Sequence, residues 1–448
     1  MINIPSTNFG RQYKALIEKN FAESIADAAR MRINIENSSA HYHGYTVHTL
    51  FTPKLYSHED YAHLEKIAGT IYGILDKVIK EYIKNPQYRE LFGFDERLES
   101  LILRPSLYDA SLPIARIDLF YNPETRNFKF CEFNTDGSSG MNEDRELNNA
   151  LDKSAIFKEF CKTHTVTRFE FFDSWVDEFT KIYKSSSAFK ENARVAIVDF
   201  MSSASNEEFE EFKRAFKRRG YECEICDIYK LKRVNNRLIS PDGNEIDVVY
   251  RRAVTCDIME NYDRITPFIE AAKNNEVVLI GDFKTQVAHN KLLFKILRDD
   301  MTKAFLTDSE NEFIERHIPK TYLLTNETIE KYNVLEDKDS WIVKPADSYA
   351  SKGVLAGVEV DDKEKWCHFI AEHAGTGYLL QEYVTPFKTE NIDLVWDKNA
   401  DFRWFSNITG MFVYNGRLQG LYSRIANNGV ISTQYSEMTL ATMLAENV

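Results

Sequence analysis

The strongest constraint on the fold is the stretch at residues 114–140, IARIDLFYNPETRNFKFCEFNTDGSSG. Two strand-like runs, at residues 114–121 and 127–134, flank a proline-containing turn at 122–126. Two such runs on either side of a turn predict a β-hairpin. An antiparallel strand pair at this position is therefore the first element that the fold must contain.

Polar side chains interrupt both arms of this hairpin. Arg116 and Asp118 stand on the first arm, and Glu132 and Asn134 stand on the second. Because strand side chains alternate in direction, Glu132 and Asn134 share a face and lie about 7 Å apart along the chain. A carboxylate and an amide oxygen form a hard-oxygen pair of the kind that Mg²⁺ accepts beside phosphate oxygens. The alternative is a hairpin end whose polar groups only hydrogen-bond to one another.

A small, hydroxyl-rich turn follows the hairpin at residues 135–140, TDGSSG. Its backbone amides could face a bound anion. Residues 141–151 are predicted to form a helix that starts directly after the turn, so the positive end of the helix dipole would point at the same site. The sequence therefore predicts an anion site next to the metal-binding pair.

Composition limits the classes of function. The chain has 448 residues, and its 56 Lys and Arg against 69 Asp and Glu give a net charge of −13, which argues against a nucleic-acid binder. No apolar run approaches the roughly 20 residues of a membrane span, and the N-terminus does not resemble a cleavable leader. The six cysteines are scattered, which is typical of a reducing, cytoplasmic environment. We expect two or three domains, the first of them mostly helical at residues 9–31 and 59–83.

A parallel β-α-β unit is expected further along the chain. Residues 194–200 and 221–228 have the apolar character of strands, and the charged segment 206–219 between them has the periodicity of a helix. This order implies a parallel strand pair with a right-handed crossover.

Two arginines follow the next expected strand. Residues 235–238 and 245–250 are predicted to form a hairpin whose second strand leads into Arg251 and Arg252. Ligands collect outside the carboxyl ends of strands in open parallel sheets, where two arginines could clamp a carboxylate. The alternative is a pair of solvated surface arginines.

The last part of the chain contains a candidate phosphate-binding loop. Residues 341–344 are predicted to form a strand that opens the run WIVKPADSYASKGVLAG, and a helix that carries Lys291 is expected at residues 285–298. Small residues in this run would let backbone amides approach a triphosphate, while Lys344 supplies a point charge. The run is not GxxxxGK[ST], so a Walker-type loop is excluded. The alternative is a plain hairpin with a surface lysine.

Further strands are expected at residues 354–358, 377–384, 391–396, 403–413 and 418–424. The second of these is apolar and ends in Gln381, Glu382, Tyr383 and Val384. Exposed peptide edges and one carboxylate at such a strand end suit adenine and ribose.

Four blocks in this order resemble the circularly permuted ATP-grasp ligases, the group of glutathionylspermidine synthetase-like proteins and eukaryotic-type glutathione synthetases. The blocks are ARIDLFYN…FCEFNTDGSSG, DVVYRR, VKPADSYASKGV and LYSRIANNGVIS. They span about residues 114–432. Each block is weakly diagnostic alone, whereas the ordered set is more specific.

The resemblance implies an ATP- and Mg²⁺-dependent ligase that joins an amine to a carboxylate through an acyl-phosphate. It implies a role for each of the following residues: Glu132 and Asn134 as metal ligands with Asp347 as a third; Arg116 at the transferring phosphoryl group; Lys291 and Lys344 on the nucleotide phosphates; Ser351, Lys352 and Gly353 in a closing loop; Gln381, Glu382, Tyr383 and Val384 around adenosine; and Ser138, Ser139, Arg252 and Arg424 on the substrate. One departure stands out, because Ser348 takes the place of an acidic residue and Ala350 and Ser351 replace glycines.

The resemblance also implies the fold class: an α/β (α+β) chain with an ATP-grasp-type fold in permuted order. We expect a helical N-terminal region with the metal-binding hairpin at residues 1–190, a small parallel-sheet substrate domain at 191–300, and a nucleotide-binding region with the lid loop at 301–448. Two other functions stay open: a nucleotide-binding protein without ligase activity, and a small-molecule phosphotransferase. The sequence identifies neither the carboxylate nor the amine, which could be small molecules or peptides, and it is compatible with a homo-oligomer.

Overall fold

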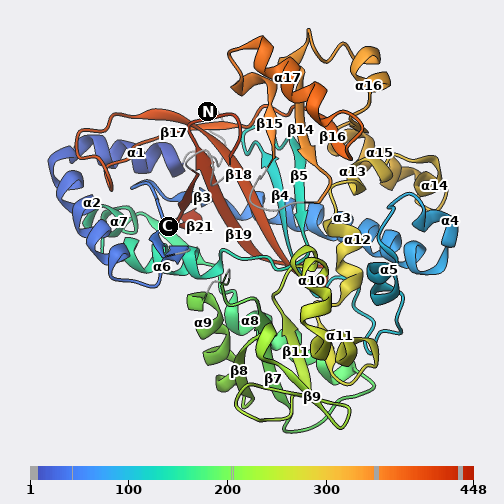
Figure 1. Cartoon of the computed structure of the whole chain (residues 1–448). Helices are drawn as coiled ribbons and strands as arrows, with labels where there is room; N and C mark the ends of the chain where they lie inside the picture. The colour runs from blue at the N-terminus through green and yellow to red at the C-terminus, as the bar shows by residue number, and fades with distance from the viewer. Residues whose placement is uncertain (1–8, 43, 203, 205, 348–352, 432–436) are drawn as a thin grey trace.

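A central antiparallel sheet carries the polar hairpin, and three groups of elements surround it (Figure 1). The structure is a computed structural model that describes residues 9–42, 44–202, 204, 206–347, 353–431 and 437–448. In Figure 1 the N-terminal helices lie to the left, a parallel sheet lies below and a third sheet lies above. Within the described residues, no helix combines the length and apolar character needed to cross a lipid bilayer.

The central sheet has the strand order β20-β19-β18-β4-β5, and β17 pairs with β18 outside this path. Its strands are β4 (Ile114–Tyr121), β5 (Phe128–Asn134), β17 (Lys388–Asn391), β18 (Arg403–Tyr414), β19 (Arg417–Ala426) and β20 (Met438–Leu440). The predicted hairpin is confirmed, since β4 pairs antiparallel with β5. Arg116 lies opposite Asn134 and Asp118 lies opposite Glu132, so all four polar side chains share one face of the sheet.

The other face of this sheet packs on a long helix, α3 (His58–Lys84). Ile117 and Leu119, which alternate with the polar residues of β4, share a buried cluster with Ile71 and Ile74 of α3. A capping box at Ser57 and Asp60 starts the helix. The helix predicted at residues 59–83 is therefore confirmed, and it leaves the polar face of the sheet open for a ligand.

The helix predicted at residues 9–31 is two helices, α1 (Phe9–Lys19) and α2 (Phe21–Glu36). Asn20 separates them with φ −121° and ψ 42°, a non-helical conformation that a weak helix former adopts readily. These helices pack with α6 (Met141–Leu151) and α7 (Ala155–Phe160), and the predicted helix at residues 141–151 is confirmed. A small sheet, β3-β21-β6, joins this region to the last strand of the chain. Its strands are β3 (Lys54–Tyr56), β6 (His164–Arg168) and β21 (Thr442–Asn447), and a further hairpin is formed by β1 (His41–Tyr42) and β2 (Tyr45–Thr46).

The predicted β-α-β unit is confirmed as β7 (Arg194–Asp199), α9 (Asn206–Arg218) and β8 (Glu222–Asp227). The parallel sheet has the order β12-β11-β7-β8, with β11 (Val248–Arg251) and β12 (Val278–Ile280).

The hairpin predicted at residues 235–238 and 245–250 is wrong. β10 (Arg237–Ile239) pairs with β9 (Lys232–Val234), whereas β11 runs parallel to β7 and β12. Asn235 and Asn236 both have positive φ, which favours the tight β9–β10 turn. All four residues of β11 are buried, as expected for a strand in the middle of a parallel sheet.

A third sheet, β13-β16-β14-β15, forms the upper part of Figure 1. Its strands are β13 (Thr321–Leu323), β14 (Trp341–Pro345), β15 (Leu355–Ala356) and β16 (Tyr378–Glu382). The strands predicted at 341–344 and 377–384 are thus confirmed, but that at 354–358 is shorter because a 3₁₀ turn begins at Gly357. The strand predicted at 391–396 is wrong: β17 ends at Asn391, and a turn follows.

The helix predicted at residues 285–298 is also wrong as a single element. It is split into α12 (Gln286–His289) and α13 (Leu293–Ile296). Asn290 between them is extended, and its side chain accepts a hydrogen bond from the Leu292 amide. The break lets the Lys291 amide donate to the Ala346 carbonyl at 2.9 Å, which ties Lys291 to the exit of β14.

The remaining helices surround these sheets. They are α4 (Pro86–Arg89), α5 (Glu96–Ile102), α8 (Phe172–Ser185), α10 (Thr255–Glu260), α11 (Thr266–Lys273), α14 (Asp300–Lys303), α15 (Asp308–His317), α16 (Asn326–Lys331) and α17 (Lys363–His373).

Candidate functional site

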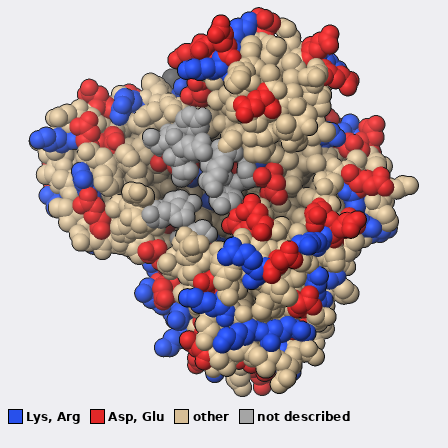
Figure 2. All heavy atoms as spheres, viewed as in Figure 1, with Lys and Arg blue, Asp and Glu red and all other residues tan. Residues whose placement is uncertain are grey.

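A cavity of about 840 Å³ lies where the three large sheets meet. Its volume is in the range of small-molecule and cofactor sites. The polar face of β4 and β5 lines it, together with the ends of β14 and β16, the start of α6 and the carboxyl end of β7. On the face drawn in Figure 2, acidic and basic side chains are interspersed, and no large basic patch is visible among the described residues. The basic groups that could bind an anionic ligand are therefore sought inside the cavity.

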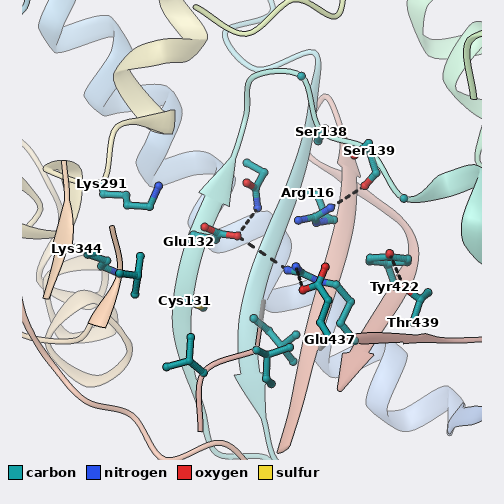
Figure 3. Close-up of a pocket in the computed structure, with 18 of the residues that line it drawn as sticks. Arg116, Cys131, Glu132, Ser138, Ser139, Lys291, Lys344, Tyr422, Glu437 and Thr439 are labelled. Atoms are coloured by element: carbon teal, nitrogen blue, oxygen red, sulfur yellow. Dashed lines mark hydrogen bonds and ion pairs between the residues drawn. The ribbon is translucent and has the colours of Figure 1, made fainter. Parts of the chain in front are cut away.

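One end of the cavity holds a carboxylate with two lysines on the same side of it. Lys291, from the α12–α13 break, and Lys344, from β14, lie on one side of Glu132 (Figure 3), and the Glu132 carboxylate lies 4.0 Å from the Arg424 guanidinium. Burial raises the pKa of Glu132, but Lys291, Arg424 and Arg116 outweigh burial and lower it to about 2. Glu132 is therefore ionised at neutral pH.

Lys344 is a buried cation, with 5% of its surface exposed. Its ammonium lies 5.4 Å from the centre of the Phe294 ring and forms no ion pair with any carboxylate in the described part of the chain. Burial lowers the pKa of Lys344 to about 8. A charge in such a place normally has a partner, so the geometry favours an anionic ligand here.

Two arginines converge on one buried carboxylate at the middle of the cavity. Arg116 donates from Nε and Nη2 to Asp118 at 2.9 and 3.0 Å, and Arg424 donates to the same carboxylate at 2.6 Å. Arg424 also pairs with Glu437 at 3.0 Å. Asp118 is fully buried, so it holds both guanidinium groups in fixed positions on the cavity wall.

The amide of Asn134 is part of the same network. Its Nδ2 donates to Asp118 at 3.1 Å and to Glu132 at 3.2 Å. The predicted hydrogen bonds among the polar groups at the hairpin end are therefore present. Within the described part of the chain, no donor is recorded for the amide oxygen of Asn134. Among the residues that the structure describes, no group of three or more His, Cys, Asp or Glu is arranged to hold a metal ion.

The turn at residues 135–140 uses its carbonyls as well as its amides. Arg116 donates to the Ser139 carbonyl at 2.7 Å, and Arg252 donates to the Ser138 carbonyl at 2.5 Å. Both serines line the cavity.

The anion predicted at the start of α6 is supplied by the protein itself. The amides of Gly140, Met141 and Asn142 donate to one carboxylate oxygen of Glu208 at 3.1, 2.9 and 3.3 Å. Glu208 comes from α9 and also pairs with Arg252 at 2.9 Å. An open anion site at this helix end is therefore not observed.

Both predicted arginines, Arg251 at the end of β11 and Arg252 directly after it, are buried, so the surface alternative is wrong. Arg251 pairs with Asp136 at 2.6 Å and donates to the carbonyls of Gly281 and Ala253. It does not line the cavity, whereas Arg252 does. The predicted clamp of two arginines is therefore reduced to Arg252.

The proposed adenosine wall lines the cavity in full, with Gln381, Glu382, Tyr383 and Val384 all on its surface. The Gln381 side chain donates to Thr321 at 2.7 Å, and the Glu382 carboxylate accepts from the Lys320 amide at 3.3 Å.

The lid loop is described only at its edges. Ser351 and Lys352, like Ser348 and Ala350, lie outside the described residues. Gly353 has φ +72°, and a Cβ there would lie 2.7 Å from the Tyr378 hydroxyl. Asp347 accepts a hydrogen bond from Gln286 at 2.8 Å and does not line the cavity, so its role as a third metal ligand stays a prediction.

Sequence reasoning missed several residues of this cavity. Glu143, Tyr422 and Glu437 line it, and Asp118, which was recognised as a polar hairpin residue but was given no role, holds Arg116 and Arg424. The role of Asp118 could have been predicted, because Asp118 lies on the same strand face as Arg116. Glu143 carries no such signal, since an acidic residue in the first turn of a helix is ordinary.

No protein-family model matches this chain, and no curated protein matches its sequence. Among solved structures, a glutathione synthetase-like effector from Globodera pallida in its apo form is similar over 94% of this chain and 96% of that chain. Its TM-score is 0.60 at 10% sequence identity. A Methylobacillus flagellatus protein with a provisional description as a gamma-glutamylcysteine synthetase aligns over 87% of this chain and 89% of its own at 11% identity, but its TM-score of 0.34 is too low to indicate a shared fold. The chain therefore shares its overall fold with the glutathione synthetase-like effector.

Proposed function

We propose that this protein is an ATP-dependent carboxylate–amine ligase that forms an amide bond through an acyl-phosphate. The observation that carries the proposal is the convergence of Glu132, Lys291, Lys344, Arg116 and Arg424 in one cavity. These residues come from segments up to about 300 positions apart in the sequence (424 − 116 = 308). Phosphoryl transfer needs in-line placement and charge neutralisation, and such a cluster can provide both.

The charges of the site fit a nucleotide triphosphate. The buried Lys344 ammonium has no described carboxylate partner, and a phosphate group would neutralise it. Lys291 approaches the same space, and the wall at residues 381–384 would hold the adenosine end. The four blocks that resemble permuted ATP-grasp ligases support the same assignment.

The donor set also fits Mg²⁺. Glu132 is ionised and the Asn134 amide oxygen is hard, which suits a cation that takes few protein ligands and completes its shell with phosphate oxygens and water. Glu132 and Asn134 would hold the ion, which would neutralise phosphate charge when bound. Asp347 would join them only if it turned from Gln286 toward the cavity.

The remaining residues would activate and position the substrate carboxylate. Arg116 and Arg424, held by Asp118, would stabilise the negative charge of the carboxylate and of the transferring phosphoryl group. Arg252, Ser138 and Ser139 line the neighbouring wall and would contact the rest of the substrate. Exclusion of water from the cavity during the reaction would protect the activated carboxyl group from hydrolysis.

The test is an ADP-release screen with MgATP. Amino acids, polyamines and short peptides are offered as amines together with carboxylates, and products are read by mass spectrometry. We expect ADP and an amide from the wild type and neither from Glu132→Gln or Lys344→Ala, because each variant removes a charge at the phosphates. Lys363→Ala removes an exposed lysine of α17 that pairs with Glu336 and serves as the matched control.

Three results would contradict the proposal. Wild-type turnover in Glu132→Gln and Lys344→Ala would remove both residues from the mechanism. ATP binding in a calorimetric titration, with no ADP for any pair, would identify a nucleotide-binding protein. A stable phosphorylated product formed without an amine would identify a phosphotransferase.

A further inference from the structure

Glu143 lines the part of the cavity that lies away from the two lysines. Glu143 stands in the first turn of α6 and accepts a hydrogen bond from the Tyr422 hydroxyl at 2.5 Å. The hydroxyl of Thr439 lies 3.5 Å from the same oxygen. Its carboxylate forms no ion pair with an arginine or lysine among the described residues.

Glu143 lies close to Arg116, because Tyr422 contacts both residues. The Tyr422 ring that binds it lies 5.5 Å from the Arg116 guanidinium. Figure 3 shows Tyr422 and Thr439 on one side of Arg116 and the two lysines on the other. In the proposed function, the nucleotide phosphates lie at Lys291 and Lys344, and the substrate carboxyl group lies at Arg116. Glu143 is then on the opposite side of this carboxyl group from the phosphate that leaves.

We propose that Glu143 is the general base that takes a proton from the attacking amine. This inference rests on the proposed ligase function and adds a catalytic residue to it. An alkyl amine is protonated at neutral pH and cannot attack until it loses one proton. Glu143 can accept this proton, whereas the lysines and arginines on the other side of the cavity cannot.

The proton and electron balance is simple. The ammonium gives one proton to a Glu143 oxygen, and the freed nitrogen lone pair forms the C–N bond with the activated carboxyl carbon. The C–O bond to phosphate breaks, and phosphate leaves with that electron pair. The second nitrogen proton passes to the departing phosphate, which leaves a neutral amide.

The surroundings of Glu143 suit this role. Burial raises the pKa of Glu143 to about 7; the Tyr422 hydrogen bond and Arg116 act in the opposite direction, while Glu208 and Glu437 raise it further. A base with a pKa near the working pH balances ionisation against basicity.

The two neighbouring carboxylates are neutralised by partners. Glu208 pairs with Arg252 and accepts from three backbone amides, and Glu437 pairs with Arg424 at 3.0 Å. Asp199, at the carboxyl end of β7, also lines the cavity, and burial raises its pKa to about 6. Asp199 is therefore the competing candidate that the experiment must separate from Glu143.

The experiment compares a protonated with an unprotonated nucleophile. The full chain with MgATP receives glutamate, aspartate or dipeptides as carboxylates, and either methylamine or hydroxylamine as the amine. Hydroxylamine is largely unprotonated at neutral pH and needs no base for its first proton. We expect Glu143→Gln to lower methylamide formation by about 10²- to 10⁴-fold and hydroxamate formation by less than about threefold.

Two further readouts separate chemistry from folding. Glu146→Gln makes the same change one turn later on α6, at a residue that pairs with Arg145 and does not line the cavity, and should leave both rates unchanged. Tyr422→Phe removes the hydrogen bond that lowers the pKa of Glu143, so the rising limb of the pH–rate profile should move to higher pH.

The outcomes are distinct. A wild type that makes neither product overturns the ligase function, and the base role falls with it. A wild type that makes both, with Glu143→Gln losing both equally while its thermal unfolding is unchanged, overturns the base role alone. Selective loss of the methylamide in Asp199→Asn, with Glu143→Gln active, would transfer the role to Asp199.

Discussion

Arg252 donates to Glu208 at 2.9 Å inside the protein, where the two side chains are 3% and 1% exposed. The same carboxylate accepts hydrogen bonds from the first amides of α6. This pair therefore joins three elements: the end of β11, the start of α9 and the turn that enters α6. It holds the parallel sheet against the cavity wall.

Removing the charge of Glu208 should leave the buried Arg252 without its ion-pair partner. We expect Glu208→Gln to lower the free energy of unfolding by about 3–5 kcal/mol, the usual cost of breaking one partner of a buried pair. Urea unfolding at pH 7 measures this. The exposed Arg32–Glu36 pair is the control, since Glu36→Gln should cost no more than about 0.5 kcal/mol. A Glu208→Gln protein as stable as the wild type would show that the pair does not hold these elements together.

Lys344 should make the free protein less stable at neutral pH. Burial lowers its pKa to about 8, below the value of 10.5 that it has when exposed, so the unfolded chain binds this proton more tightly. Stability should therefore rise as pH increases from about 8 to 10.5, and Lys344→Met should remove this rise. At pH 7 we expect Lys344→Met to raise the free energy of unfolding by about 1–3 kcal/mol.

The same variant should lose its response to nucleotide. Wild-type protein at an ATP concentration of about 100 times Kd should gain about 2.7 kcal/mol of stability, and Lys344→Met should gain little. Thermal unfolding with and without MgATP checks both halves. If the variant is destabilised without nucleotide, Lys344 has a structural partner and the anion-site interpretation fails.

Much of the local structure around the cavity could be predicted from sequence. The hairpin of β4 and β5, the helix α6 and the strands β14 and β16 follow from alternation, turn residues and helical periodicity, which act over a few positions. The two short helices around Lys291 could not, because the break at Asn290 depends on a hydrogen bond from Lys291 to Ala346, which is distant in sequence.

The arrangement of charges inside the cavity depends on long-range pairing. β18 lies between β4 and β19, which brings Arg424 to within 2.6 Å of Asp118 across 306 positions. No local pattern encodes such a contact, and only the ordered resemblance to a ligase family pointed to Arg424. Glu208 shows the opposite case. The sequence suggested that an anionic ligand binds at the start of α6, but the Glu208 carboxylate occupies that position. Glu208 lies in the charged helix α9, and nothing in the local sequence indicates that its side chain is buried.

Glu132 should contribute to stability above its ordinary pKa and lose that contribution in acid. Burial raises its pKa, but Lys291, Arg424 and Arg116 lower it from 4.5 to about 2, so the folded state holds the ionised form. Its stabilisation is complete above about pH 4.5 and disappears as pH falls toward 2. We expect wild type to lose about 2 kcal/mol more than Glu132→Gln between pH 5 and 2 in urea unfolding. Parallel pH curves for the two proteins would refute this electrostatic account.

Gly137 is the position where the turn before α6 tolerates no side chain. It has φ +63°, and a Cβ would lie 2.7 Å from the Arg252 carbonyl oxygen and from a methyl of Val254. Gly137→Ala should cost about 1–2 kcal/mol for the left-handed backbone and about 1–3 kcal/mol more for the overlap. Gly220 is the matched control, because it has φ +82° but a Cβ there would meet no described atom within 4 Å, so Gly220→Ala should pay the backbone cost alone. Thermal and urea unfolding compare the two variants.

The same substitution should also affect activity. Because the Arg252 carbonyl belongs to buried backbone that cannot move away, the turn itself must shift, and the Ser138 and Ser139 carbonyls would move away from the arginines that they contact. Gly137→Ala should therefore also lose ATP-dependent turnover while Gly220→Ala keeps it. Equal effects of the two substitutions would show that the turn is not packed tightly against Arg252 and Val254.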